Sequence, residues 1–179
     1  MVGSLSSEVK EAKERVRVAL NNSGYTLPAS HITINLSPAN IRKDGSAFDL
    51  PIAIAILKCM GKIQICKEME GALFIGELGL GGEVRFSTGI LPVVLEAKRK
   101  GIRHCFVPYA NRKEAQVVEG VSVYGVRFIK DVIKILENEK EGTAKDVMEE
   151  AARITVEEIN EKRGTTIIMA THDKVIVDK

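Results

Sequence analysis

Residues 37–56, SPANIRKDGSAFDLPIAIAI, contain a charged loop and the start of a strongly apolar helix. The preceding residues 31–36, HITINL, alternate apolar and polar side chains, which predicts a half-buried strand. Asp49 is a good helix N-cap, and Pro51 suits the first helical turn, where a missing N–H costs nothing. Residues 50–60 are nearly all apolar, so we expect a helix that is buried on most sides.

The loop before this helix carries the most polar chemistry of the stretch. It places Arg42 and Lys43 next to Gly45 and Ser46. Two cations, a flexible glycine and a hydroxyl near a helix start are typical of an anion-binding site or of a nucleophile. A charged loop that only caps a core helix has the same composition. We favour the capping loop, because loops of this composition are common, and keep the anion site or nucleophile as the alternative.

Composition bounds the class of protein. The chain has 179 residues, of which 45% are hydrophobic and 28% charged, with a net charge of +2, which fits one globular domain with or without an appendage. Aromatic residues make up 4% and Trp is absent, which argues against recognition of nucleic acids by base stacking. The three cysteines have no metal-binding spacing, and neither a signal peptide nor a membrane-spanning run is evident. We expect a cytoplasmic protein without a metal or another cofactor.

Helical and strand-like patterns alternate along the first 137 residues. The expected helices cover 6–22, 50–60, 89–100, 112–118 and 129–136, and the expected strands cover 31–36, 72–78, 83–86, 105–107 and 121–126. The glycines between the second and third strands predict a hairpin. This alternation predicts an α/β fold, or α+β sandwich, with helices packed on a sheet.

Individual polar residues of these elements also have expected roles. The charged residues of the first helix, Arg15 among them, fall mostly opposite its apolar stripe, so we expect them to face solvent. Asn111 can cap the helix over 112–118. Glu77 either lies buried in its strand or faces water. His31 and His104 are isolated and lack metal-like spacing.

The composition changes near residue 138. Residues 138–179 carry 7 Lys and Arg against 10 Asp and Glu, whereas residues 1–137 carry 19 against 14. We therefore expect two units, a domain at 1–137 and a tail at 138–179. Within the tail we expect a long helix over about 142–162 and a buried strand at 165–170, TTIIMA, which is β-branched and apolar.

Four long stretches of residues 2–137 carry a resemblance to a known family. They read VGSLSSEVKEAKERVRVAL, ITINLSPANIRKDGSAFDLPIAIAIL, FIGELGLGGEVRFSTGILPVVLEAKRKGI and VPYANRKEAQVVEGVSVYGV. They resemble the N-terminal domain of the magnesium-chelatase-related competence proteins of the ComM type. The resemblance implies a fold like the proteolytic domain of Lon, in the S5 domain 2-like class. It also implies that the domain precedes an AAA+ ATPase module tied to DNA handling in competence.

Two departures from the family pattern bear on activity. The further N-terminal strand of the family is expected to be missing here. No GxxxxGK[ST] motif occurs, because Gly61-Lys62 is followed by Ile63, so we expect no ATP hydrolysis by this chain. The lysine of the Ser–Lys dyad of Lon aligns with Leu91, and leucine cannot act as a base. We therefore expect no peptidase activity, with Ser46 as a vestigial candidate nucleophile.

Residues 157–179, EEINEKRGTTIIMATHDKVIVDK, resemble a late segment of a cell-division ABC-type ATPase. His172 matches the switch histidine of that family, but the phosphate loop and the acidic magnesium motif are missing. We expect His172 to be a vestigial surface residue and the chain to bind no nucleotide there. The two resemblances together indicate a fusion or chimera. We expect strand 165–170 to join the sheet where the family's N-terminal strand would lie.

Three functions follow. We favour a non-catalytic Lon-like module that assembles with, or regulates, the AAA+ ATPase module of its parent protein. The second is a nucleic-acid-binding module with weak DNA contact. Its basic face would consist of Arg42, Lys43, Lys98, Arg99, Lys100, Arg103, Arg112 and Lys113. The third is a residual hydrolase, which needs a base within hydrogen-bond reach of Ser46 Oγ. Homo-oligomerisation is left open.

Overall fold

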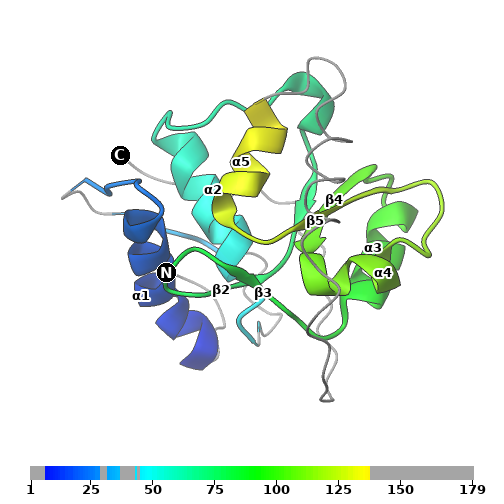
Figure 1. The fold of residues 1–179 in the computed structure, drawn as a ribbon, viewed down its shortest axis with the longest axis horizontal. Coiled ribbons are helices and arrows are strands. Elements are labelled where there is room, and N and C mark those ends of the chain that lie inside the picture. The colour runs from blue at the N-terminus through cyan, green and yellow to red at the C-terminus, as the bar shows by residue number, and fades with distance from the viewer. Residues whose placement is uncertain (1–6, 29–31, 37–42, 44, 138–179) are drawn as a thin grey trace.

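The computed structural model describes residues 7–28, 32–36, 43 and 45–137 (Figure 1). These form a mixed α/β fold, which confirms the predicted fold class. The helices are α1 (Ser7–Asn22), α2 (Asp49–Cys59), α3 (Ile90–Arg99), α4 (Arg112–Ala115) and α5 (Ile129–Glu137). The strands are β1 (Leu73–Phe74), β2 (Glu77–Leu78), β3 (Val84–Arg85), β4 (His104–Pro108) and β5 (Ser122–Val126). Two short 3-10 turns cover Lys67–Met69 and Tyr109–Asn111.

The strands form a parallel sheet and a hairpin. The sheet has the order β1-β4-β5, and α3 and α4 connect its successive strands. The register places Phe74 of β1, Phe106 of β4 and Tyr124 of β5 side by side, and neighbouring rings in this row stack at 4.8 Å between centroids. Strands β2 and β3 pair antiparallel, with Glu77 opposite Arg85.

Helices cover both faces of the sheet (Figure 1). Side chains of β4 alternate between two core clusters, as a strand buried on both faces requires. Phe106 packs into the cluster that holds α1, α2 and α5, whereas Cys105 and Val107 pack into the cluster that holds α3 and α4. Helix α2 is buried over most of its length between α1 and the sheet, as its apolar sequence predicts.

Three local predictions differ from the structure. Residues 32–36 keep the predicted alternation of burial, but only Asn35 among them forms a β-bridge. The predicted strand 72–78 is divided into β1 and β2 at Gly76, because Gly76 makes backbone hydrogen bonds to the start of α2 instead of extending the strand. The helix predicted over 112–118 ends at Ala115, and the buried Asn111 side chain bonds the backbone of Ser87 rather than capping that helix.

The tail predictions, namely the helix over 142–162, the strand 165–170 and the surface position of His172, lie outside the described residues. His31 and Arg42 lie outside them as well. Among the helices that the structure describes, none has the length and apolar character needed to cross a membrane.

Candidate functional site

Two backbone hydrogen bonds join the start of α2 to Gly76, the residue before β2. The Gly76 N–H donates to the Ala47 carbonyl at 3.0 Å, and the Leu50 N–H donates to the Gly76 carbonyl, also at 3.0 Å. A side chain at Gly76 would not fit, since a Cβ there would lie 2.7 Å from Val84 Cγ1. This close approach sets Glu77 and Leu78 directly beside the first turn of α2.

The backbone hydrogen bonds of Gly76 bring Ser46 and Glu77 together. The Ser46 hydroxyl donates a hydrogen bond to Glu77 Oε2, and both side chains are partly buried. The Glu77 carboxylate also faces Arg85 of β3, with Oε1 and Nη1 4.0 Å apart. Ser46 was predicted to lie at the helix entry. Its bond to Glu77 was not predicted, because the sequence left open whether Glu77 faces the interior or water.

Asp49 forms the second polar pair at this helix start. Arg15 of α1 donates to both carboxylate oxygens, from Nε to Oδ2 at 2.8 Å and from Nη2 to Oδ1 at 3.1 Å. The Leu78 N–H adds a bond to Oδ2 at 3.3 Å. The Asp49 side chain is 0% exposed, so this bidentate pair satisfies a fully buried carboxylate.

Burial and pairing act in opposite directions on this ion pair. Loss of solvation raises the pKa of Asp49, and the Arg15 guanidinium partly offsets that rise. The hydrogen bond to Asp49 in turn raises the pKa of Arg15. Because guanidinium stays protonated at any physiological pH, the arginine remains a cation beside the carboxylate.

Two predictions about these residues were wrong. Asp49 is not the N-cap, because Phe48 occupies that position and makes no side-chain cap. Arg15 is not a solvated residue of α1, since its side chain is only 21% exposed. No local signal reveals the pair, because Arg15 and Asp49 are 34 residues apart and each has an ordinary role within its own helix.

The structure describes three of the four candidate anion-binding residues. Arg42 is outside the described residues, whereas Lys43 is buried, with 4% of its surface exposed. Gly45 is half-buried with a φ of 83°, and the Ser46 hydroxyl already binds a carboxylate. Asp49 and Glu77 place two carboxylates beside the helix start, which disfavours a bound anion. The anion site stays a prediction.

The other catalytic candidates lie elsewhere. Leu91 is half-buried against the core cluster that holds α3 and α4. Lys98 and Lys100, at the end of α3, are exposed. His104 makes a 3.1 Å contact from Nδ1 to the Tyr124 hydroxyl, at one end of the aromatic row. In the part of the chain that the structure describes, no three His, Cys, Asp or Glu residues gather where they could hold a metal ion.

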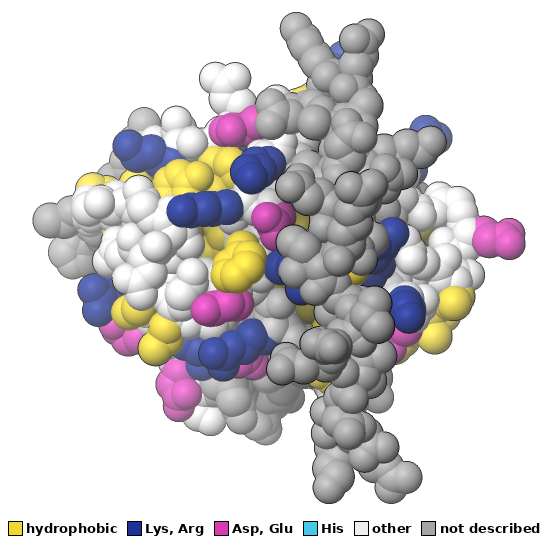
Figure 2. Space-filling view, in the orientation of Figure 1, with side chains coloured by type: hydrophobic (Ala, Val, Ile, Leu, Met, Phe, Trp, Pro, Cys, Tyr) yellow, Lys and Arg dark blue, Asp and Glu magenta, His cyan; other side chains and the backbone are white. Residues whose placement is uncertain are grey.

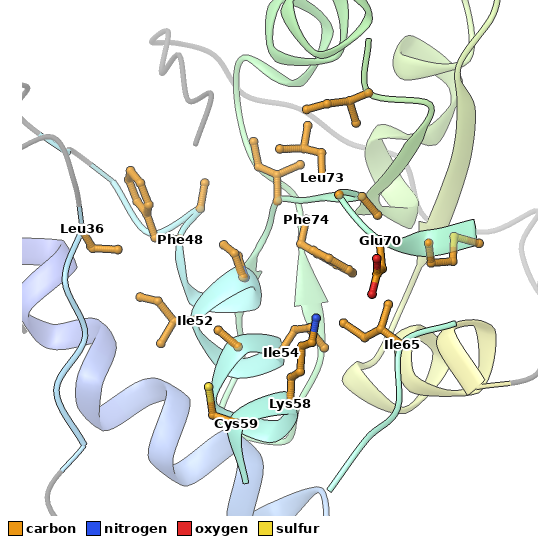
Figure 3. Close-up of a pocket in the computed structure, with 18 residues that line it drawn as sticks. Leu36, Phe48, Ile52, Ile54, Lys58, Cys59, Ile65, Glu70, Leu73 and Phe74 are labelled. Atoms are coloured by element: carbon orange, nitrogen blue, oxygen red, sulfur yellow. The ribbon is translucent and has the colours of Figure 1, made fainter. Parts of the chain in front are cut away.

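A second feature lies along the outer face of α2. It is an apolar cavity of about 590 Å³, bordered by α2, by residues 65–72 and by β1 (Figure 3). Ile52, Ile54 and Phe74 are among the side chains that line it. Two charged side chains, Lys58 and Glu70, also line it and point toward each other (Figure 3). No sequence pattern indicates this cavity, because it lies between segments that are distant in the chain.

Comparison with known proteins identifies the family. The model of subunit ChlI of Mg-chelatase matches residues 1–111. The chain belongs to this family. The predicted relation to the magnesium-chelatase-related proteins is therefore confirmed, and it includes the ComM type. Competence protein ComM of Haemophilus influenzae is 37% identical over 153 residues, which cover 85% of this chain and 30% of ComM.

Two further relatives match parts of this chain. An uncharacterized protein of Mycobacterium tuberculosis is 41% identical over 127 residues, which are 71% of this chain and 25% of that protein. Lon protease of Buchnera aphidicola is 30% identical over 102 residues, 54% of this chain and 13% of Lon. The chain spans less than a third of the length of each of these relatives.

Proposed function

We propose that this ChlI-family chain is a non-catalytic Lon-like module that assembles with, or regulates, the AAA+ ATPase module of a competence-related protein in the cytoplasm. The observation that carries the proposal is the pairing of Ser46. Its hydroxyl is bonded to the Glu77 carboxylate, and the structure records no bond from it to an amine among the described residues. Cys59 and Cys105 are free thiols, which suits a reducing compartment.

The chemistry of the pair supports a structural role. The Glu77 carboxylate accepts from the Ser46 hydroxyl and also faces Arg85, so it joins the loop before α2 to the β2–β3 hairpin. The neighbouring Asp49–Arg15 pair is buried and bidentate, so the whole helix start is tied together by internal polar contacts.

A residual hydrolase is the second candidate, and the same hydrogen bond favours it. A carboxylate within reach of Ser46 Oγ is a base in the geometric sense, which the sequence did not lead us to expect. The test is exposure of the full chain to a fluorophosphonate probe, together with a casein-cleavage assay. We expect neither labelling of Ser46 nor cleavage. Labelling that disappears in Ser46→Ala and falls in Glu77→Gln would establish the hydrolase instead.

The partnership with an ATPase has its own test. The stretch of ComM that this chain matches is replaced by the matching stretch of this chain, and ATP hydrolysis is compared with that of intact ComM and of ComM lacking the stretch. We expect the replacement to bring the rate back toward that of intact ComM. A rate equal to that of the shortened ComM would contradict the assembly or regulatory role. Ser46→Ala in the replaced segment should leave the rate unchanged.

The basic nucleic-acid-binding face ranks lower. Lys43 is buried and cannot contribute to it as an exposed cation. Arg99 is engaged with Glu96 at 3.1 Å. On the face shown in Figure 2, the described Lys and Arg side chains are interspersed with Asp and Glu. Such mixing weakens attraction to a phosphate backbone. Any DNA binding should be weak and should be lost as salt is raised.

A further inference from the structure

We infer that the apolar cavity beside α2 and β1 is a docking site for an extended apolar segment, and that its occupant is residues 165–170 of this chain, TTIIMA. This inference is independent of the proposed function. It rests on the lining of the cavity, on the edge of the sheet beside it and on the place where the described chain ends.

The cavity has the form of a strand-binding groove. One wall is the face of α2 that carries Pro51, Ala55 and Cys59. The other includes Leu73 and Phe74 of β1 and Ile75, the residue after it. Strand β1 is at the edge of the sheet, and no described strand pairs with it on the side away from β4. An edge strand beside an apolar groove offers backbone hydrogen bonds and side-chain pockets together, which is how β-augmentation binds a peptide.

The size and lining suit a short apolar segment. A volume of about 590 Å³ falls in the range that encloses a small ligand, so a few aliphatic side chains fill it. Residues 165–170 contain such side chains, and in an extended chain the adjacent Ile167 and Ile168 would point to opposite sides.

The chain leaves the described region next to this cavity. Glu137, at the end of α5, lines a smaller neighbouring cavity together with Ile65, and Ile65 also lines the large one. The Cys66 N–H donates to the Leu136 carbonyl at 3.4 Å, which fixes the end of α5 there. The 27 residues between Glu137 and residue 165 reach back easily, since even a helical connection rises about 1.5 Å per residue.

The two charged side chains that line the cavity favour an uncharged occupant over a charged ligand. Lys58 and Glu70 face each other across the cavity, so an anionic ligand such as a fatty acid would meet the Glu70 carboxylate as well as the ammonium. Residues 165–170 contain no charged side chain and leave that arrangement undisturbed. A second copy of this chain could present the same segment, and the experiment separates the two arrangements.

The first test uses the native thiol of Cys59, which lines the cavity. In the full chain, Ile167 and Ile168 are both changed to Asp, and the rate of Cys59 alkylation is followed by mass spectrometry. We expect the rate to rise by about tenfold or more, because two carboxylates cannot enter an apolar cavity. The matched control changes Val175 and Ile176 to Asp, a similar apolar pair just beyond the segment, and should leave the rate as it is. Equal rates in both variants would overturn the inference.

The second test keeps the fold intact and identifies the occupant. Ile167→Cys and Ile168→Cys are made separately in full-length Cys66→Ser protein, which is then oxidised mildly. Docking brings one of the two new thiols within disulfide range of Cys59, where Cα atoms lie about 4.4–6.8 Å apart. We expect an intramolecular disulfide from one of the two variants. A disulfide between two chains would assign the cavity to a second copy, and no disulfide, or an apolar ligand in native mass spectra, would also overturn the inference.

Discussion

The start of α2 and its outer face belong to one helix but are built in opposite ways. At the start, Asp49 is fully buried and bound by Arg15, and Ser46 is bound by Glu77. Along the outer face, apolar side chains line an open cavity of about 590 Å³. A buried polar group that lacks a hydrogen-bond partner destabilises the fold, so its partner must come from the same fold. An apolar surface can instead be covered by another segment or by a partner. Internal polar contacts therefore join the helix start to its neighbours, whereas the outer face of the same helix borders an apolar cavity.

The largest effect should come from breaking the buried ion pair. Asp49→Ala leaves the Arg15 guanidinium partly buried without its carboxylate, which we expect to lower the free energy of unfolding by about 3 kcal/mol. Chemical denaturation measures this loss. The matched control is Glu14→Ala, which removes the exposed pair between Glu14 and Arg17 and should cost less than about 1 kcal/mol. Similar losses in both variants would contradict the structural role of the polar cluster.

The next largest effect concerns the close approach of the backbone at Gly76 to the start of α2 and to Val84. Gly76→Ala places a Cβ 2.7 Å from Val84 Cγ1, so we expect a loss of about 2 kcal/mol in the free energy of unfolding from overpacking. The control repeats the change in a Val84→Ala background, where the crowding atom is gone. There Gly76→Ala should cost clearly less. An undiminished cost would mean that crowding against Val84 is not the cause.

The free energy of unfolding should depend on pH through the Cys105 thiol, which is buried in the other core cluster and has no paired charge like that of Asp49. Burial raises the pKa of the Cys105 thiol from 9.0 to about 12. Between these values the unfolded chain loses this proton while the folded chain keeps it. The free energy of unfolding should therefore fall as pH rises, by at most about 1.4 kcal/mol per pH unit from this group. Denaturation at several pH values should show a shallower fall in Cys105→Ala, and identical slopes would contradict the assignment.

The smallest effect should come from the serine. Ser46→Ala removes one partly buried hydrogen bond, while Glu77 keeps Arg85 at 4.0 Å, so we expect a loss of about 1 kcal/mol in the free energy of unfolding. Thermal or chemical denaturation measures it beside Asp49→Ala. A loss as large as that of Asp49→Ala would make the hydroxyl, rather than the ion pair, the main support of the helix start.

The elements with a clear local pattern were predictable. The first helix was expected over 6–22 and is found at Ser7–Asn22, and the last was expected over 129–136 and is found at Ile129–Glu137. The apolar periodicity of such segments depends only on neighbouring residues. The predicted strand 72–78 failed in its centre, because Gly76 makes its hydrogen bonds to a helix start that lies far away in the sequence.

The candidate site was predictable only in part. Ser46 and Asp49 were both singled out near the helix start, but Asp49 was assigned the role of a cap. Its partner Arg15 was assigned to a solvated face, and Glu77 had no assigned role. Each of these residues is polar for a reason that lies in another element. Side-chain pairs across 31 and 34 residues leave no periodic signal in the sequence.

The alternation of helices and strands, the apolar character of α2 and the membership of the ChlI family follow from the amino-acid sequence alone, because they depend on local periodicity and on long matching stretches. The structure was needed to show that Arg15 neutralises Asp49, that Glu77 binds Ser46 and that an apolar cavity lies beside β1. These features arise where segments distant in the chain meet. There the need to satisfy buried polar groups and to cover apolar surface is settled by packing, which no single stretch of sequence contains.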